Sequence, residues 1–441
     1  MSLAGRLWYH WNVDAIGRLA LRWIRRQAER RAARGRHWQS EVLAPPLDIS
    51  PRTKELIGRH FLRGRYANLN TKVAWVTSGA PVEFLQALGY YLLYPENHAA
   101  LCGTARWAVD IASAAEEAGY SRDICSYART DLGTLLSGKT PVGRLPRPDL
   151  LVACTNICQT VLHWYRVLAH HFRIPLILID TPFIYTQATD HAVAFVVRQL
   201  EEAIAVAERV TGKSMDVAAF RRATELSRTA SFLWLEIIER CKHRPAPISV
   251  FDQFIHMAPI VELRGEGETV DFYAAMLAEI DDRIARGIGA VQDERRRLLW
   301  DNLPIWYRLR TLAEFLGRHH VVIAASTYTN AWAELTHLMD PQRPLESMAR
   351  TYLHPILNRG TGDKLATMRR LIQDYQLDGV ILHSDRSCKP YSLGQMDQRD
   401  RLIREYNVPA LLLEADHNDS RSFSEEQVAA RLDAFLELLG V

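Results

Sequence analysis

The sequence predicts an α/β protein of two doubly wound parallel-sheet lobes with a helical layer and an N-terminal helical extension. Apolar, strand-like runs alternate with helical stretches in residues 61–190 and again in residues 301–441, as in sheets built from right-handed crossover units. Residues 191–300 instead carry long, charged, Ala-rich periodic stretches, which favours helices. A chain of 441 residues is long enough for two or three such units.

Residues 1–60 are the predicted extension, which is basic and rich in tryptophan. A basic helix can bind RNA, anionic lipid or an acidic partner surface. The tryptophans favour a plainer interpretation, an extension packed on a partner subunit or on the chain's own surface. The residues concerned are Arg22, Arg25, Arg26, Arg30, Arg31, Arg34 and Arg36, with Trp8, Trp11, Trp23 and Trp38.

The first lobe, residues 61–190, has three strand candidates and three helix candidates. The predicted strands are residues 72–77, 149–154 and 174–180. The predicted helices are residues 82–93, 106–118 and 160–172. The last two strands and the helix between them form a unit whose length implies a parallel pair.

The helical layer and the second lobe follow. The layer should contain helices over residues 193–210, 217–241 and 270–299. The second lobe should contain strands over residues 321–325, 379–383 and 408–413 and helices over residues 362–375, 394–406 and 424–439. Both lobes carry cysteines where strands end, which suggests that they face one cleft.

Composition narrows the class of protein. No apolar run reaches the ~18 residues that a membrane span needs, and the N-terminus lacks the apolar core of a signal peptide. We therefore expect a cytoplasmic protein, in which the six cysteines are not structural disulfides. The net charge of +3 gives no reason to expect nucleic acid.

Three cysteines lie in polar loops just before predicted helices. Cys388 follows the strand that ends near residue 383, Cys158 follows the strand that ends at Cys154, and Cys125 opens a helical stretch. Thiolates are favoured at helix N-termini, and cysteine-only ligation suits an iron–sulfur cluster or zinc. The paired Cys-x2-Cys knuckles typical of zinc are absent. Buried, reduced cysteines without a ligand are the alternative, and we favour it for Cys102 and Cys241.

These segments together resemble a known family. The chain is similar, over roughly residues 70–440, to the two-subunit catalytic core shared by ATP-dependent benzoyl-CoA reductases and 2-hydroxyacyl-CoA dehydratases. The markers are Ser78-Gly-Ala-Pro-Val-Glu83, Tyr94-Pro-Glu-Asn-His98, Gly119-Tyr120, Cys125-Ser-Tyr-Ala-Arg129, the segment around Cys158 and Arg386-Ser-Cys-Lys-Pro-Tyr-Ser-Leu-Gly-Gln395. The last motif, with Thr327-Tyr-Thr-Asn-Ala-Trp332 and Glu414-Ala-Asp416, looks closer to the benzoyl-CoA reductases.

The resemblance implies an iron–sulfur cluster, 4Fe-4S, bound by Cys125, Cys158 and Cys388. It also implies catalytic roles for Ser78 and Glu96 near the substrate, to which we add His98 from the same motif. Gln159 stands where the family often has Asp after its second ligand, and the role of Cys154 is left open.

The implied function is that of the catalytic subunit of a benzoyl-CoA-type reductase, which reduces an aromatic acyl-CoA ring one electron at a time to a cyclohexadienoyl-CoA. The implied partners are a homologous catalytic subunit and a separate ATP-hydrolysing iron–sulfur activator, since this chain has no P-loop motif. Two alternatives remain. One is a 2-hydroxyacyl-CoA dehydratase subunit, in which a ketyl radical expels a hydroxyl group, and the other is a non-catalytic, cluster-bearing partner subunit.

Overall fold

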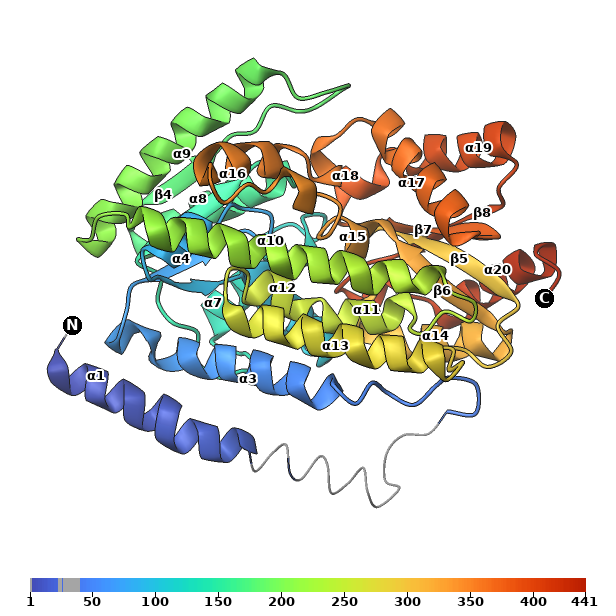
Figure 1. The fold of residues 1–441 in the computed structure, drawn as a ribbon, viewed down its shortest axis with the longest axis horizontal. Coiled ribbons are helices and arrows are strands. Elements are labelled where there is room, and N and C mark those ends of the chain that lie inside the picture. Colours follow the sequence, from blue (N-terminus) through green and yellow to red (C-terminus); the bar gives the residue numbers. More distant parts are fainter. Residues whose placement is uncertain (1, 23–25, 27–39) are drawn as a thin grey trace.

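Two parallel sheets of four strands each form the two lobes of the computed structural model, which describes residues 2–22, 26 and 40–441 (Figure 1). The first sheet has the order β2-β1-β3-β4 and the second the order β6-β5-β7-β8. The two orders are equivalent. In each sheet the second strand is added on one side of the first and the later strands on the other side, so the order of addition reverses between the two central strands, as in doubly wound sheets. The predicted fold class is therefore confirmed.

The strands are short, and the central ones are almost wholly buried, as expected where helices cover a parallel sheet. The first sheet consists of β1 (Val73–Val76), β2 (Tyr91–Leu93), β3 (Leu150–Cys154) and β4 (Leu176–Ile179). The second consists of β5 (Arg296–Asp301), β6 (Val321–Ser326), β7 (Gly379–Asp385) and β8 (Ala410–Ala415).

Helices follow the strands in both lobes. The first lobe contains α4 (Glu83–Ala87), α5 (Pro95–Thr104), α6 (Ala108–Glu117), α7 (Ser126–Ser137) and α8 (Gln159–Phe172). The second contains α14 (Leu309–Arg318), α15 (Thr327–Asn330), α16 (Pro344–Leu353), α17 (Thr361–Tyr375), α18 (Lys389–Ser392), α19 (Gln395–Tyr406) and α20 (Glu425–Leu438). α6 and α7 pack closely because Gly133 has no side chain where a Cβ would meet the carbonyl of Ile111.

The segment between the lobes is helical. It comprises α9 (Asp190–Thr211), α10 (Val217–Glu239), α11 (Val250–His256), α12 (Ala258–Glu262) and α13 (Gly267–Ala285). Figure 1 shows α10 running past both lobes, and it packs against α13 and α4. Thr189 and Asp216 cap the N-termini of α9 and α10 with their side chains, so the two long helices begin at defined residues.

Two predicted elements were wrong. Residues 82–93 form the short helix α4 followed by β2, and residues 270–299 form α13 followed by the start of β5. Arg297 lies in β5 with no exposed surface, and its guanidinium donates to Glu294 and to main-chain carbonyls. β5 could not be predicted from the sequence, because buried strands are identified by apolar runs and this strand begins with two arginines.

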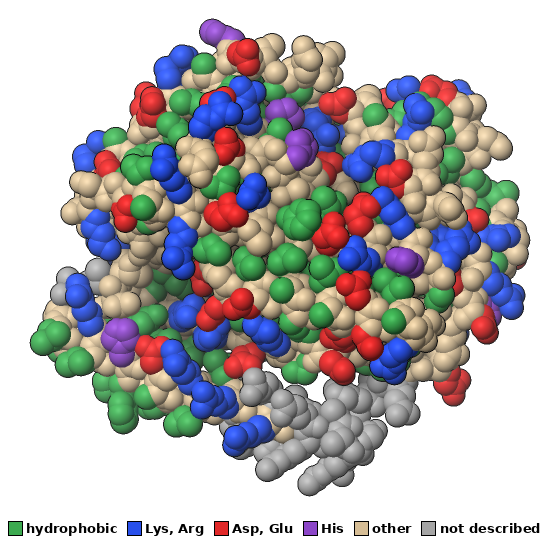
Figure 2. Space-filling model, in the orientation of Figure 1, with side chains coloured by type: hydrophobic (Ala, Val, Ile, Leu, Met, Phe, Trp, Pro, Cys, Tyr) green, Lys and Arg blue, Asp and Glu red, His purple; other side chains and the backbone are tan. Residues whose placement is uncertain are grey.

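The N-terminal extension is helical where it is described. It contains α1 (Leu3–His10), a π-helix over Trp11–Gly17 and α3 (Ser50–Tyr66). Apolar side chains of α1 and the π-helix are exposed, among them Leu7, Trp8 and Trp11, and they gather at the lower left of Figure 2. Apart from Arg22 and Arg26, the basic cluster of residues 22–36 lies outside the described residues, as do Trp23 and Trp38.

None of the described helices is both long enough and apolar enough to cross a membrane.

Candidate active site

The carboxyl ends of the central strands hold the predicted site residues. Ligands of doubly wound sheets bind where the strand order reverses, outside these ends. In the first lobe, Ser78 follows β1 and Cys158 follows β3, and these two strands are neighbours at the reversal. In the second lobe, Trp306 follows β5 and Cys388 follows β7, in the equivalent positions.

The three predicted cysteine ligands each stand directly before a helix. Cys125 precedes α7, Cys158 precedes α8 and Cys388 precedes α18. All three are half-buried and line one cavity of about 990 Å³ between the lobes. Residues separated by more than two hundred positions in the sequence therefore meet in one place.

The neighbouring thiols contribute to the ionisation behaviour of Cys158 and Cys388. Burial, with the nearby Cys125, raises the pKa of Cys158 to about 12. Burial, with Asp385 and the other two cysteines nearby, raises the pKa of Cys388 well above its ordinary value. A cation that binds all three sulfurs would offset this cost by stabilising the thiolates, as metal ions do. The donor set therefore fits an iron–sulfur cluster with three protein ligands.

The other three cysteines are fully buried and do not line the cavity. Cys154 ends β3 inside the core, with burial raising its pKa to about 12. Cys241 donates to the carbonyl oxygen of Ile248, and Cys102 lies beside His98. Cys158 rather than Cys154 is the member of that pair that faces the cavity.

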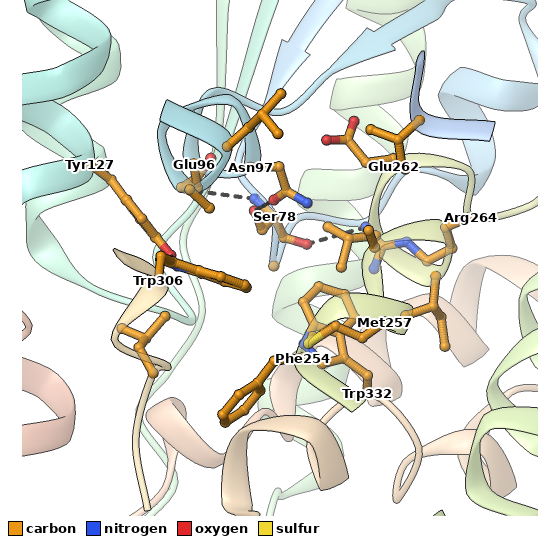
Figure 3. Close-up of a pocket in the computed structure, with 18 of the residues that line it drawn as sticks. Ser78, Glu96, Asn97, Tyr127, Phe254, Met257, Glu262, Arg264, Trp306 and Trp332 are labelled. Carbon is orange, nitrogen blue, oxygen red and sulfur yellow. Dashed lines mark hydrogen bonds between the residues drawn. The ribbon is translucent and has the colours of Figure 1, made fainter. Parts of the chain in front are cut away.

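Ser78 and Glu96 lie side by side on the cavity wall (Figure 3). The backbone N–H of Ser78 donates to Glu96 Oε1 at 3.1 Å, and the Ser78 hydroxyl donates to Asn97 Oδ1 at 2.9 Å. Pro95 begins α5, so Glu96 and Asn97 occupy its first turn and point toward the end of β1. Sequence reasoning missed Asn97, although it stands within the motif that contains Glu96.

Glu96 has the ionisation behaviour of a buried acid. Burial raises its pKa to about 8, against a smaller lowering effect of hydrogen bonds from backbone N–H groups. Its Oε2 is buried and has no hydrogen-bond partner among the described residues. The side chain is therefore protonated at neutral pH and has a free oxygen with which to exchange a proton.

His98 lies elsewhere. It has no exposed surface and does not line the cavity, and its Nε2 is 2.8 Å from the Thr140 hydroxyl. Burial lowers its pKa to about 4, so the imidazole is neutral. His98 follows the motif into the interior of the first lobe, where it has no contact with the cavity.

Aromatic side chains form much of the remaining wall. Tyr127 and Trp306 meet across the lobes, where the indole N–H donates to the phenol oxygen, and Phe254 lies below them (Figure 3). On the opposite side the Arg264 guanidinium lies 5.5 Å from the ring of Trp332 and donates to the main-chain carbonyl of Ser78 at 3.3 Å. This wall can exclude water from a bound molecule, and Arg264 keeps a positive charge beside Ser78.

Asp385, Asp416 and His417 form a buried polar cluster behind Cys125. His417 Nδ1 lies 2.7 Å from Asp385 Oδ2, and its Nε2 lies 3.9 Å from the sulfur of Cys125. Burial lowers the pKa of His417, but the two carboxylates outweigh burial and raise it well above the ordinary value. We did not predict this cluster as functional, although Asp416 lies just past a strand end, in the position that led us to the cysteines.

Comparison with known proteins gives the family. Residues 77–439 match the family described as 2-hydroxyglutaryl-CoA dehydratase, D-component. The chain is 32% identical over 375 residues to the (R)-2-hydroxyisocaproyl-CoA dehydratase alpha subunit of Clostridioides difficile, which covers 83% of this chain and 90% of that protein.

Two further relatives show the range of the similarity. The alpha subunit of lactoyl-CoA dehydratase from Anaerotignum propionicum is 29% identical over 383 residues, covering 83% of this chain and 90% of that protein. A benzoyl-CoA reductase subunit from Thauera aromatica is 27% identical over 402 residues, covering 88% of this chain and 93% of that protein. The family therefore contains dehydratases and reductases that act on acyl-CoA, and the comparisons favour the dehydratase alternative over our first expectation of a reductase.

With its fold, its cavity and the match over most of its length, the chain belongs to the 2-hydroxyglutaryl-CoA dehydratase D-component family.

Proposed function

We propose that this protein is a catalytic subunit of a 2-hydroxyacyl-CoA dehydratase, which removes water from a 2-hydroxyacyl thioester. One observation carries the proposal: three cysteines suited to a cluster, a protonated glutamate and a serine hydroxyl all line a single, largely apolar cavity. The dehydratase relatives support the choice of reaction.

The reaction needs a reversible one-electron reduction, because the hydroxyl group next to a thioester carbonyl is otherwise a poor leaving group. An iron–sulfur cluster held by Cys125, Cys158 and Cys388 would supply that electron and take it back, so the reaction has no net redox change. The protein's own side chains have to hold the thioester, move two protons and exclude water.

In this proposal Glu96 moves the protons. When the C2–O bond breaks, hydroxide leaves, and the protonated carboxyl of Glu96 can give it a proton to form water. The resulting carboxylate can then accept the proton lost from C3 as the double bond forms, which restores the acid. Burial suits both steps, because a pKa of about 8 places the two protonation states close in free energy at neutral pH.

Ser78 and the aromatic wall complete the arrangement. The Ser78 hydroxyl can rotate from Asn97 to donate to the thioester oxygen, where negative charge develops. Tyr127, Trp306 and Phe254 keep water from the reduced substrate, which would otherwise lose its electron. A homologous second subunit and a separate ATP-hydrolysing activator are further parts of the proposal, because one-electron reduction of a thioester needs a strong reductant.

The test is an anoxic assay of the purified complex with MgATP and a reduced donor. We expect (R)-2-hydroxyisocaproyl-CoA or a related 2-hydroxyacyl-CoA to yield an enoyl-CoA, detected by mass spectrometry, and Glu96→Gln to lower the rate at least ~100-fold. Cys241→Ala, a fully buried cysteine outside the cavity, is the matched control.

Two outcomes would contradict the proposal. A cyclohexadienoyl-CoA formed from benzoyl-CoA, with no dehydration, would make the protein a reductase subunit. Undiminished turnover in a Ser78→Ala, Glu96→Gln double variant would make it a non-catalytic partner of the true catalytic subunit.

A further inference from the structure

The loops that carry Cys125 and Cys388 belong to different lobes and are joined by one buried hydrogen-bond network. β7 and β8 are neighbouring parallel strands with Asp385 paired to Ala415, so the residues that follow each strand lie side by side. Asp385 Oδ1 accepts from the backbone N–H groups of Ser387 and Cys388 at 3.1 and 3.2 Å. The backbone of the Cys388 loop is thereby fixed to its own strand.

Asp416 connects this loop to the first lobe. Its two oxygens accept from the hydroxyl groups of Ser126 at 2.6 Å and Ser387 at 2.5 Å. The backbone N–H of Ser126 also donates to the Ser387 oxygen at 3.1 Å. Ser126 and Ser387 each stand next to a cavity cysteine, so Asp416 sets the spacing between the two loops.

The same bonds assign the hydrogens of His417. A carboxylate only accepts, so the Ser126 hydroxyl hydrogen points to Asp416 and its oxygen is left to accept from His417 Nε2 at 2.9 Å. Nδ1 donates to Asp385 at 2.7 Å. The Nε2–H group therefore lies between two acceptors, the Ser126 oxygen and the Cys125 sulfur, the latter at 3.9 Å.

The three side chains could also be taken for a metal site, because their ligand atoms lie within 4.8 Å of one another. Each of those atoms already has a close hydrogen-bond partner, and a cation would have to displace Ser126 and Ser387 from Asp416. The geometry is that of a hydrogen-bond network.

We propose that Asp385, Asp416 and His417 are positioning residues, which fix the sulfurs of Cys125 and Cys388 across the lobe interface, and that His417 donates a hydrogen bond to the Cys125 sulfur. The proposal rests on the ligand role of Cys125 given under the proposed function. Hydrogen bonds to a ligating sulfur stabilise the reduced, more negative cluster and raise its reduction potential.

The test uses two variants that should shift the midpoint potential of the cluster in opposite directions. His417→Leu removes the donor, so the midpoint potential of the cluster in the purified complex should fall and iron loss to a chelator should accelerate several-fold. Ser126→Ala removes the competing oxygen acceptor and leaves the His417 N–H to the sulfur alone, so the midpoint potential should rise. Ser126→Ala also removes the hydroxyl bond to Asp416, but it keeps the backbone N–H bond from residue 126 to Ser387, so the proposal stays testable where His417→Leu fails to fold.

The matched control is His383→Leu. His383 is also fully buried, on β7, but its Nδ1 bonds to the main-chain oxygen of Leu303. The His383→Leu variant should have lower thermal stability than the wild type and the same midpoint potential of the cluster. Unchanged potentials in the His417 and Ser126 variants, shifts of the same sign in both, or an equal shift in His383→Leu would overturn the proposal. A wild-type complex without iron would overturn the ligand assignment itself.

Discussion

Replacing Glu96 by glutamine should make the protein more stable, and increasingly so as the pH rises. Glutamine has the same shape and can still accept the hydrogen bond from the Ser78 N–H, but it carries no charge at any pH. The wild-type carboxyl has a pKa of about 8 in the folded protein because burial disfavours its charged form. Folding therefore opposes its ionisation.

The magnitude follows from the shift. The pKa rises from 4.5 to about 8, and at ~1.36 kcal/mol per pH unit the full cost is about 5 kcal/mol. Below pH 4.5 the group is protonated in both states and contributes nothing. Between pH 4.5 and about 8 only the unfolded chain releases the proton, so the free energy of unfolding falls as the pH rises, and above pH 8 the whole cost is present. From pH 6 to pH 8 the wild type should lose about 2.3 kcal/mol relative to Glu96→Gln, slightly less than two full units because the folded carboxyl is half ionised at pH 8.

The assay is thermal unfolding of both proteins at pH 6, 7 and 8. The difference between their unfolding temperatures isolates Glu96, because the other groups titrate alike in both. Glu116→Gln is the control. The bonds from Arg421 and Arg129 hold the pKa of Glu116 below its ordinary value, so this variant should be destabilised by a constant amount over the same range. A Glu96→Gln difference that stays constant from pH 6 to pH 8 would refute the reasoning.

Three further predictions follow from the cavity and its surroundings. Alanine at any one of the three cavity cysteines should abolish iron binding, whereas Cys154→Ala should keep most of the iron, as measured by iron analysis of the purified complex; the reverse pattern would exchange Cys154 for Cys158. Arg129→Met should lower the free energy of unfolding by about 1.5–3 kcal/mol in denaturant titrations, because it removes the more buried of the two cations that Glu116 and Asp419 share and leaves them Arg421 alone. His98→Leu should lower the unfolding temperature through loss of the Thr140 bond and leave the iron content unchanged, and lost iron would place His98 in the site.

Much of the fold could be predicted because several strands are apolar over most of their length. β3, β4 and β6 appear in the sequence as apolar runs, and β7 begins with one, Gly379-Val-Ile-Leu382. β2 has only three residues, too few to show a period, and β5 begins with two arginines. These strands are stabilised by neighbours distant in the sequence, such as the main-chain oxygen of His243 that accepts from Arg297.

The candidate site was also predictable only in part. Cysteines that follow strands and open helices are visible in the sequence, because both positions are defined by local patterns. The network of Asp385, Asp416 and His417 was not visible, because its members act through contacts with Ser126 in the other lobe. His98 shows the converse limit, since a motif gives the spacing of residues but not the direction in which a side chain points.

The cavity exists only while the two lobes stay together, and buried charges hold them. Arg129 on α7 of the first lobe lies 2.9 Å from Asp419 of the second, and its side chain is 2% exposed. Arg421 reaches back from the second lobe to Glu116 at 2.6 Å. Partial separation would break these two pairs and leave Arg129 with Glu116 and Arg421 with Asp419, the partners that each has within its own lobe. The pairs between the lobes favour the closed state, which is the state that brings the cysteines of both lobes to the same cavity.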